Sequence, residues 1–158
     1  MDAKLNAGQL ATGRSGHADS MAAEGDIPFG TALKYGTDPE KQVAAWNGSA
    51  EADVLAGVAQ YSVGGDLDNS KYADGDSVTV ARKAVMWVKL SDSAADVTRG
   101  DKVAVRDDGL FDKAPLSEAT NGVYGVEIED AEFKSAGSAG DVVKVEFNLP
   151  SQTTTKQL

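Results

Sequence analysis

The stretch GDSVTV at residues 75–80 returns as GDKVAV at residues 100–105 and as GDVVKV at residues 140–145. The glycine of each copy can adopt the positive φ of a tight turn, and the aspartate can accept hydrogen bonds from nearby backbone N–H groups. The two valines alternate with one other residue, so in an extended chain they point to the same face. Each copy therefore predicts a turn that leads into a strand with one inward, apolar face.

Short runs containing β-branched or aromatic residues extend outward from these turns. Many of them alternate apolar and polar residues, which is typical of a half-buried strand, and clusters of Gly, Asp, Asn and Ser separate them. The runs are residues 31–35, 42–46, 54–62, 77–81, 84–90, 102–106, 123–129 and 142–149. Short helical pieces are expected only around residues 38–45 and 115–120. The predicted fold is all-β, a small β-barrel or β-sandwich with an extended N-terminal arm, since alternation does not distinguish barrel from sandwich.

The two ends of the chain differ in composition from the middle. Residues 1–26 are rich in Gly, Ala, Ser and Asp, and Leu5 and Leu10 are their only large aliphatic side chains. Such a segment buries too little apolar surface by itself to offset the entropy of ordering. We expect an extended or disordered arm at residues 1–26, with ordering against a partner as the alternative to disorder. A β-domain at residues 27–149 and a flexible tail at residues 150–158 complete the predicted organisation.

Composition narrows the function classes. The 158 residues carry a net charge of −10, one His and no Cys. An acidic chain is poorly suited to phosphate backbones, so no nucleic-acid partner is expected. Every apolar run falls short of the roughly 20 residues that a membrane helix needs, and no secretory signal is visible. These features predict a soluble, acidic protein that is made inside the cell and has no membrane partner.

No set of residues indicates catalysis or a cofactor. His17 is the only imidazole, and it lies in the least structured part of the chain. Asp66, Asp68 and Asp74 fall near the ligand positions of a calcium loop, but Lys71 stands where that loop needs glycine. We therefore expect no catalytic residue, no cofactor and no metal site, and weak calcium binding at the three aspartates stays open.

The order of several motifs resembles the head decoration, or structural cement, proteins of tailed double-stranded DNA bacteriophages. The motifs are AGQL at residues 7–10, DIPFGTALKYGTD at 26–38, GVA at 57–59, YADGDSVTV at 72–80, VTRGDKVAV at 97–105, GV at 125–126 and GDVVKV at 140–145. The resemblance covers roughly residues 7–149. It implies a non-enzymatic protein, made in the host bacterial cytoplasm, that binds the outside of the expanded head.

The resemblance also implies partners. Such a protein contacts the major capsid protein and itself, as a homotrimer rather than a homodimer, and stabilises the head against DNA pressure. The candidate contact residues are Leu5, Leu10, Ile27, Pro28, Phe29 and Trp46. For Phe29 and Trp46, packing in the core is an equally good interpretation. The alternative function is a carbohydrate- or surface-binding β-module of a phage fibre or adhesion protein, which would need exposed aromatic residues.

Overall fold

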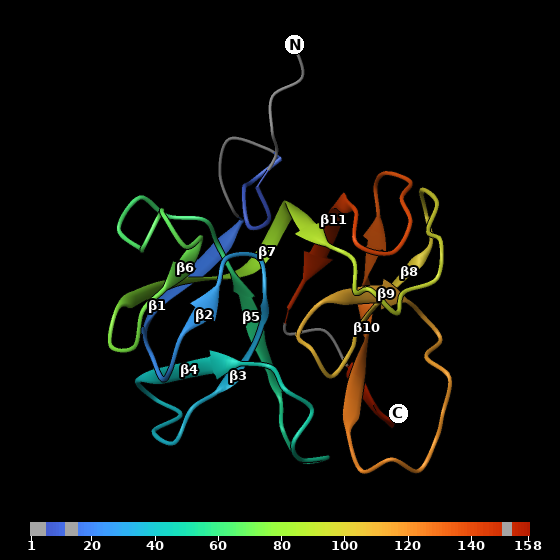
Figure 1. Ribbon diagram of the computed structural model, residues 1–158, viewed down its shortest axis with the longest axis horizontal. Helices are drawn as coiled ribbons and strands as arrows, with labels where there is room; N and C mark the ends of the chain where they lie inside the picture. Colours follow the sequence, from blue (N-terminus) through green and yellow to red (C-terminus); the bar gives the residue numbers. More distant parts are fainter. Residues whose placement is uncertain (1–5, 12–15, 150–152) are drawn as a thin grey trace.

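The computed structural model describes residues 6–11, 16–149 and 153–158, and these residues form twelve strands and no helix (Figure 1). The strands are β1 (His17–Ala23), β2 (Ile27–Pro28), β3 (Ala32–Tyr35), β4 (Gln42–Ala45), β5 (Leu55–Ala59), β6 (Lys71–Tyr72), β7 (Ser77–Lys89), β8 (Lys102–Val105), β9 (Phe111–Lys113), β10 (Tyr124–Phe133), β11 (Val142–Asn148) and β12 (Thr153–Gln157). The all-β prediction is confirmed.

The three Gly-Asp-x-Val-x-Val copies form the same turn. Gly75, Gly100 and Gly140 have φ angles of 86°, 94° and 82°, a region that favours glycine. In each copy the following aspartate accepts a hydrogen bond from the backbone N–H three residues earlier: Asp76 from Ala73, Asp101 from Thr98 and Asp141 from Ser138, at 2.8 to 2.9 Å. All six valines are at most 1% exposed. The turns therefore start β7, β8 and β11 so that the valines of each copy are buried in the core, as the sequence predicts.

Five strands close a barrel in the N-terminal half. β1 pairs with β4, β4 with β3, β3 with β5 and β5 with β7, and β7 pairs back with β1. Side chains including Ile27, Phe29, Leu33 and Val43 fill its interior. Of the two architectures that the sequence allows, the barrel is the one formed.

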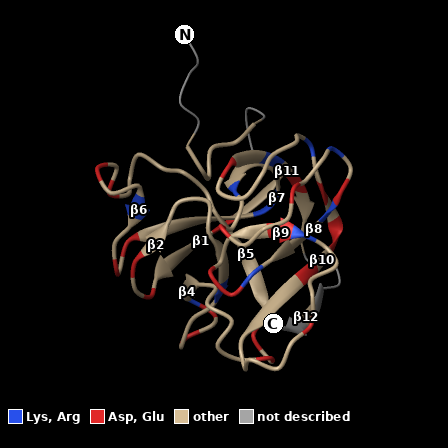
Figure 2. Ribbon diagram, turned by 45° about the vertical axis from the view of Figure 1, so that its right-hand side comes forward, with Lys and Arg blue, Asp and Glu red and all other residues tan. Residues whose placement is uncertain are grey.

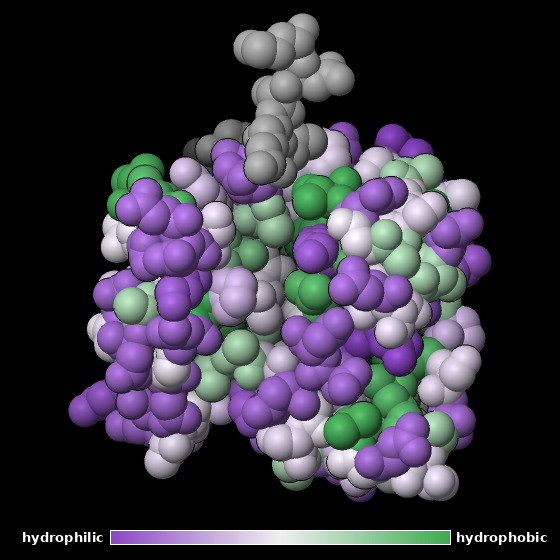
Figure 3. Space-filling model, viewed as in Figure 1, coloured by the Kyte–Doolittle hydropathy of each residue, from purple (hydrophilic) through white to green (hydrophobic). Residues whose placement is uncertain are grey.

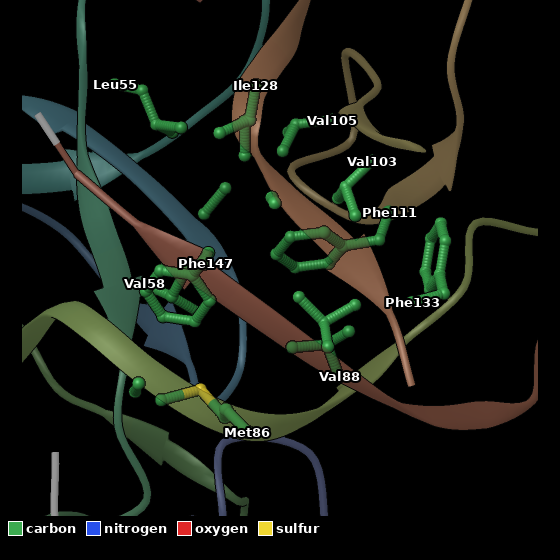
Figure 4. Close-up of a cluster of buried hydrophobic side chains, with 14 of the residues drawn as sticks. Leu55, Val58, Met86, Val88, Val103, Val105, Phe111, Ile128, Phe133 and Phe147 are labelled. Carbon is green, nitrogen blue, oxygen red and sulfur yellow. The ribbon is translucent and has the colours of Figure 1, made fainter. Parts of the chain in front are cut away.

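The long strand β7 continues out of the barrel into the second half of the molecule. There it pairs with β11, and the sheet goes on through β10 and β8 to β9. A bridge between Leu90 and Phe111 returns this sheet to the end of β7. Met86, Val88, Phe133 and other side chains fill the space that it encloses (Figure 4). Sharing one strand joins the two halves through backbone hydrogen bonds.

Part of each chain end belongs to the sheet. β1, from the segment predicted as an arm, pairs with β7 over residues 17–22. β12, from the predicted tail, pairs with β10, and Leu158 is buried beside Leu116. These strands carry little apolar alternation, and backbone pairing with a free strand edge holds them. The division into arm, domain and tail stays a prediction.

The two expected helical pieces are wrong. Residues 42–45 form the strand β4. Asp38 starts a turn, and its backbone carbonyl accepts hydrogen bonds from the N–H groups of Lys41 and Gln42. In the second piece, the N–H of Leu116 donates to the Glu127 carboxylate at 2.8 Å, and its side chain is buried. Tertiary contacts outweigh the weak local helix signal in both places.

Candidate functional site

The structure places the six candidate contact residues in different environments. Ile27, Phe29 and Trp46 are 0%, 5% and 1% exposed. Pro28 is exposed and Leu10 is half-buried against the larger core cluster. Leu5 lies outside the described residues.

Phe29 and Trp46 pack inside the protein. The Phe29 ring makes edge-on contacts with Tyr61 and Tyr72, at centroid distances of 5.1 and 5.0 Å. The Trp46 Nε1–H donates to the backbone carbonyl of Tyr124 at 3.2 Å, which links the barrel to β10. These contacts match the core interpretation, and a role of either side chain in binding a partner stays a prediction.

The AGQL motif lies along the free edge of β7. The N–H of Gly8 donates to the carbonyl of Trp87 at 2.7 Å, and the N–H of Trp87 donates to the carbonyl of Gln9 at 2.9 Å. The N–H of Ala11 donates to the carbonyl of Val85 at 2.8 Å. Leu10 forms a β-bridge with Met86 and packs on the core. Residues 6–11, which we call the N-terminal segment, are therefore docked by a short β-ladder.

Two glycines make this docking feasible. Gly8 has a φ of 88°, and a Cβ there would lie 2.8 Å from the backbone N of Gly30 and 2.9 Å from the carbonyl O of Ala59. A Cβ on Gly30 would lie 2.7 Å from the Cβ of Ala7. Sequence reasoning missed both roles, although Gly8 and Gly30 belong to the motifs that carry the family resemblance.

A groove of about 330 Å³ runs beside the docked segment. Its apolar lining includes Ala7, Pro28, Phe29 and Leu110. The fold thus places two of the predicted contact residues, Pro28 and Phe29, at the same groove as Ala7 of the N-terminal segment. Lys89 and Asp108 also line the groove, so it carries one charge of each sign.

A second hollow of about 450 Å³ lies over β7, β11 and β10. Its charged lining is mixed, with Lys83 and Lys102 against Glu132 and Glu146. Lys134 forms ion pairs with Glu132 at 2.5 Å and Glu146 at 3.4 Å. The hydrogen bond to Lys134 lowers the pKa of Glu132, and the same bond raises the pKa of Lys134. These carboxylates are engaged with cations, which is typical of a structural ion-pair network.

His17, Asp66 and Asp74, which the sequence analysis considered as functional residues, each contact another residue of the chain. His17 is exposed and contacts only the Asp19 carboxylate, at 3.3 Å, among the ion pairs found. Across residues 6–11, 16–149 and 153–158, no group of three or more His, Cys, Asp or Glu side chains could hold a metal ion. The Asp66 carboxylate instead accepts hydrogen bonds from Asn69, and the Asp74 carboxylate accepts one from Gly25. In the same ranges no helix is long and apolar enough to cross a membrane.

Comparisons with known proteins identify the family. The sequence profile of the family described as structural cement protein (E217 gp24/Pam3 gp6) matches residues 2–148. One chain of a solved structure, the capsid of Myoviridae phage XM1, has a similar fold, with a TM-score of 0.73 and 19% sequence identity. The match covers 94% of this chain and 93% of that chain. A comparison with curated protein sequences gave no significant match.

The family match spans nearly the whole chain, including both the barrel and the half built around β10 and β11. The chain therefore belongs to the phage structural cement proteins, a family of non-enzymatic capsid components.

Proposed function

We propose that this protein binds the outside of the expanded phage head and bridges neighbouring major capsid subunits. In this role it stabilises the head against the pressure of the packaged DNA. It is made in the cytoplasm of the host bacterium and acts as a homo-oligomer, with a trimer favoured over a dimer. The observation that carries the proposal is the family match over residues 2–148.

The architecture supports a mechanical role. A cement protein must transmit load between subunits without unfolding, and β7 runs through both halves of this molecule. Most close backbone contacts join segments that are distant in the sequence, so that stretching of one segment meets resistance from several strands at once. The likeness to a chain from the XM1 capsid gives further support.

The alternative, a carbohydrate-binding module, has less support from the aromatic residues. Trp46 is 1% exposed. Trp87 is half-buried, and the Lys144 ammonium lies over its ring at 5.6 Å from the centroid. Neither tryptophan thus presents the open, flat face on which a sugar ring stacks.

Binding to expanded heads tests the proposal. Heads without decoration protein are mixed with increasing amounts of the purified chain and sedimented, and the bound fraction is measured. We expect saturable, stoichiometric pelleting, and light scattering is expected to give a mass near three times 16.4 kDa. Absence of pelleting, combined with a stable monomer, would overturn the proposal.

A second measurement addresses stabilisation itself. DNA-filled heads, decorated or bare, are heated while a DNA-binding dye reports release of the genome. Decorated heads should release DNA at a higher temperature. Equal release temperatures at full occupancy would show that binding occurs without reinforcement.

A further inference from the structure

The loop between β5 and β6, residues 60–70, exposes two large apolar side chains. Val63 is 81% exposed and Leu67 is 44% exposed. Figure 3 shows apolar surface at the outer end of this loop, at the edge of the view, with hydrophilic surface next to it. Single exposed apolar residues are common on proteins, whereas larger exposed apolar patches mark interaction sites.

The backbone of this loop is fixed from several sides. Asp66 and Lys71 exchange two backbone hydrogen bonds, at 2.7 and 3.1 Å, which closes a small hairpin. The Lys71 ammonium forms an ion pair with Asp26 at 2.6 Å. Gly65 packs so closely on Phe29 that a Cβ there would lie 2.8 Å from the Cζ atom of the ring.

The side chain of Asp66 also stabilises the hairpin. It accepts hydrogen bonds from the backbone N–H and the side-chain amide of Asn69, at 3.3 and 2.8 Å. The hydrogen bond from the Asn69 side chain is the main cause that lowers the pKa of Asp66. Val63 and Leu67 are thus presented by an ordered backbone, so binding through them would cost little conformational entropy.

The charge around the loop restricts the partner. Asp66 and Asp68 flank Leu67 directly, and the nearby Lys71 is already paired with Asp26. Figure 2 shows acidic residues on this loop, and the whole chain carries a net charge of −10. A partner surface with basic residues around an apolar depression would complement both features.

We propose that the β5–β6 loop is a docking element that inserts Val63 and Leu67 into an apolar pocket with a basic rim on the major capsid protein. This inference rests on the proposed function and assigns to it a specific contact surface. The predicted contact residue Phe29 then serves the interface indirectly, because its ring packs against Gly65 of the loop.

The test compares Val63→Ser, Leu67→Ser and the double variant with wild type in the head sedimentation titration. Val54→Ser is the matched control, because Val54 is 57% exposed and lies at the opposite end of β5. Each loop variant should bind at least about tenfold more weakly, since burial of one aliphatic side chain corresponds to roughly one to two powers of ten in affinity. The control should stay within about threefold of wild type.

Two further readouts keep the outcomes distinct. Urea unfolding midpoints of the loop variants should match wild type, because the altered side chains are exposed. Binding should weaken as salt increases, and Asp68→Asn should reduce that dependence.

Wild-type pelleting with unchanged binding of all three loop variants would overturn the docking assignment and leave the proposed function standing. A fall in the light-scattering mass of the loop variants would also overturn it, because the loop would then join copies of this chain. Failure of wild type to pellet would overturn the proposed function, and the assignment of the major capsid protein as partner with it.

Discussion

Substitution of Gly8 by alanine should release the N-terminal segment from β7 while the rest of the protein stays folded. Gly8 has a φ of 88°, which costs a residue with a side chain about 1–2 kcal/mol. The new Cβ would also lie 2.8–2.9 Å from backbone atoms of Gly30, Ala59 and Tyr61, and none of these can rotate away. Overpacking of this kind typically costs about 1–3 kcal/mol.

The combined cost is about 2–5 kcal/mol, which corresponds to at least about a thirtyfold rise in the equilibrium constant for local opening. Opening need not spread, because the segment is attached to the fold mainly by its β-ladder with residues 85–87, by the hydrogen bond from the Tyr61 N–H to the Gly8 carbonyl and by Leu10. Segments at the periphery of a fold open with much smaller free energies than the core. The perturbation is therefore expected to be absorbed by undocking.

Amide hydrogen exchange measures this directly. The N–H of Trp87 bonds to Gln9 and the N–H of Tyr61 bonds to Gly8, so both amides should lose at least about thirtyfold in protection. The amide of Val88 faces β11 by strand alternation and should change little. Gly25→Ala is the control, because Gly25 has a φ of 81° but open space around its Cβ position. Unchanged protection of Trp87 and Tyr61 in Gly8→Ala would refute the reasoning.

Three other predictions concern stability. Gly100→Ala should lower the free energy of unfolding by about 1–2 kcal/mol through its φ of 94° alone, and Gly100→Asn should recover part of that loss; equal losses in urea unfolding would contradict this. The hydrogen bond from Thr98 lowers the pKa of Asp101, so this carboxylate stabilises the fold above about pH 4 and the contribution disappears as pH falls through the lowered folded-state pKa. The difference in stability between wild type and Asp101→Asn should therefore shrink on acidification, and a constant difference from pH 7 to pH 2.5 would argue against it. Phe147→Ala should cost about 3–5 kcal/mol, and fluorescence and circular dichroism should still report one coincident transition because both halves share β7; two separate transitions would show that they unfold independently.

The strand β7 shows a limit of prediction from the local sequence. The sequence predicts two runs, residues 77–81 and 84–90, where the structure has the single strand β7. Arg82 breaks the apolar alternation, but its guanidinium donates to the carbonyl of Ala56 at 2.7 Å and to the Tyr35 hydroxyl at 3.0 Å. A polar residue at the junction of the two halves is thus satisfied by partners that sequence spacing does not reveal.

The candidate contact residues show the same limit. Alternation identifies Ile27, Phe29 and Trp46 as large apolar groups, but it does not distinguish the interior of this chain from the interface with another. The structure buries all three, whereas Val63 and Leu67, which the sequence analysis did not select, remain exposed. A loop residue without periodic neighbours gives no signal of its exposure before the backbone around it is placed.

The sequence by itself determined the three Gly-Asp turns, the strands that follow them and the all-β class, because φ preference, short-range hydrogen bonds and side-chain alternation act over a few residues. The motif order also pointed to the cement protein family. Only the tertiary structure decided that β1 closes the barrel, that residues 6–11 dock on β7 and that β12 pairs with β10. These contacts depend on backbone groups of polar or small residues meeting a free strand edge far away in the chain, and every residue type offers the same N–H and C=O groups except proline, which lacks the N–H.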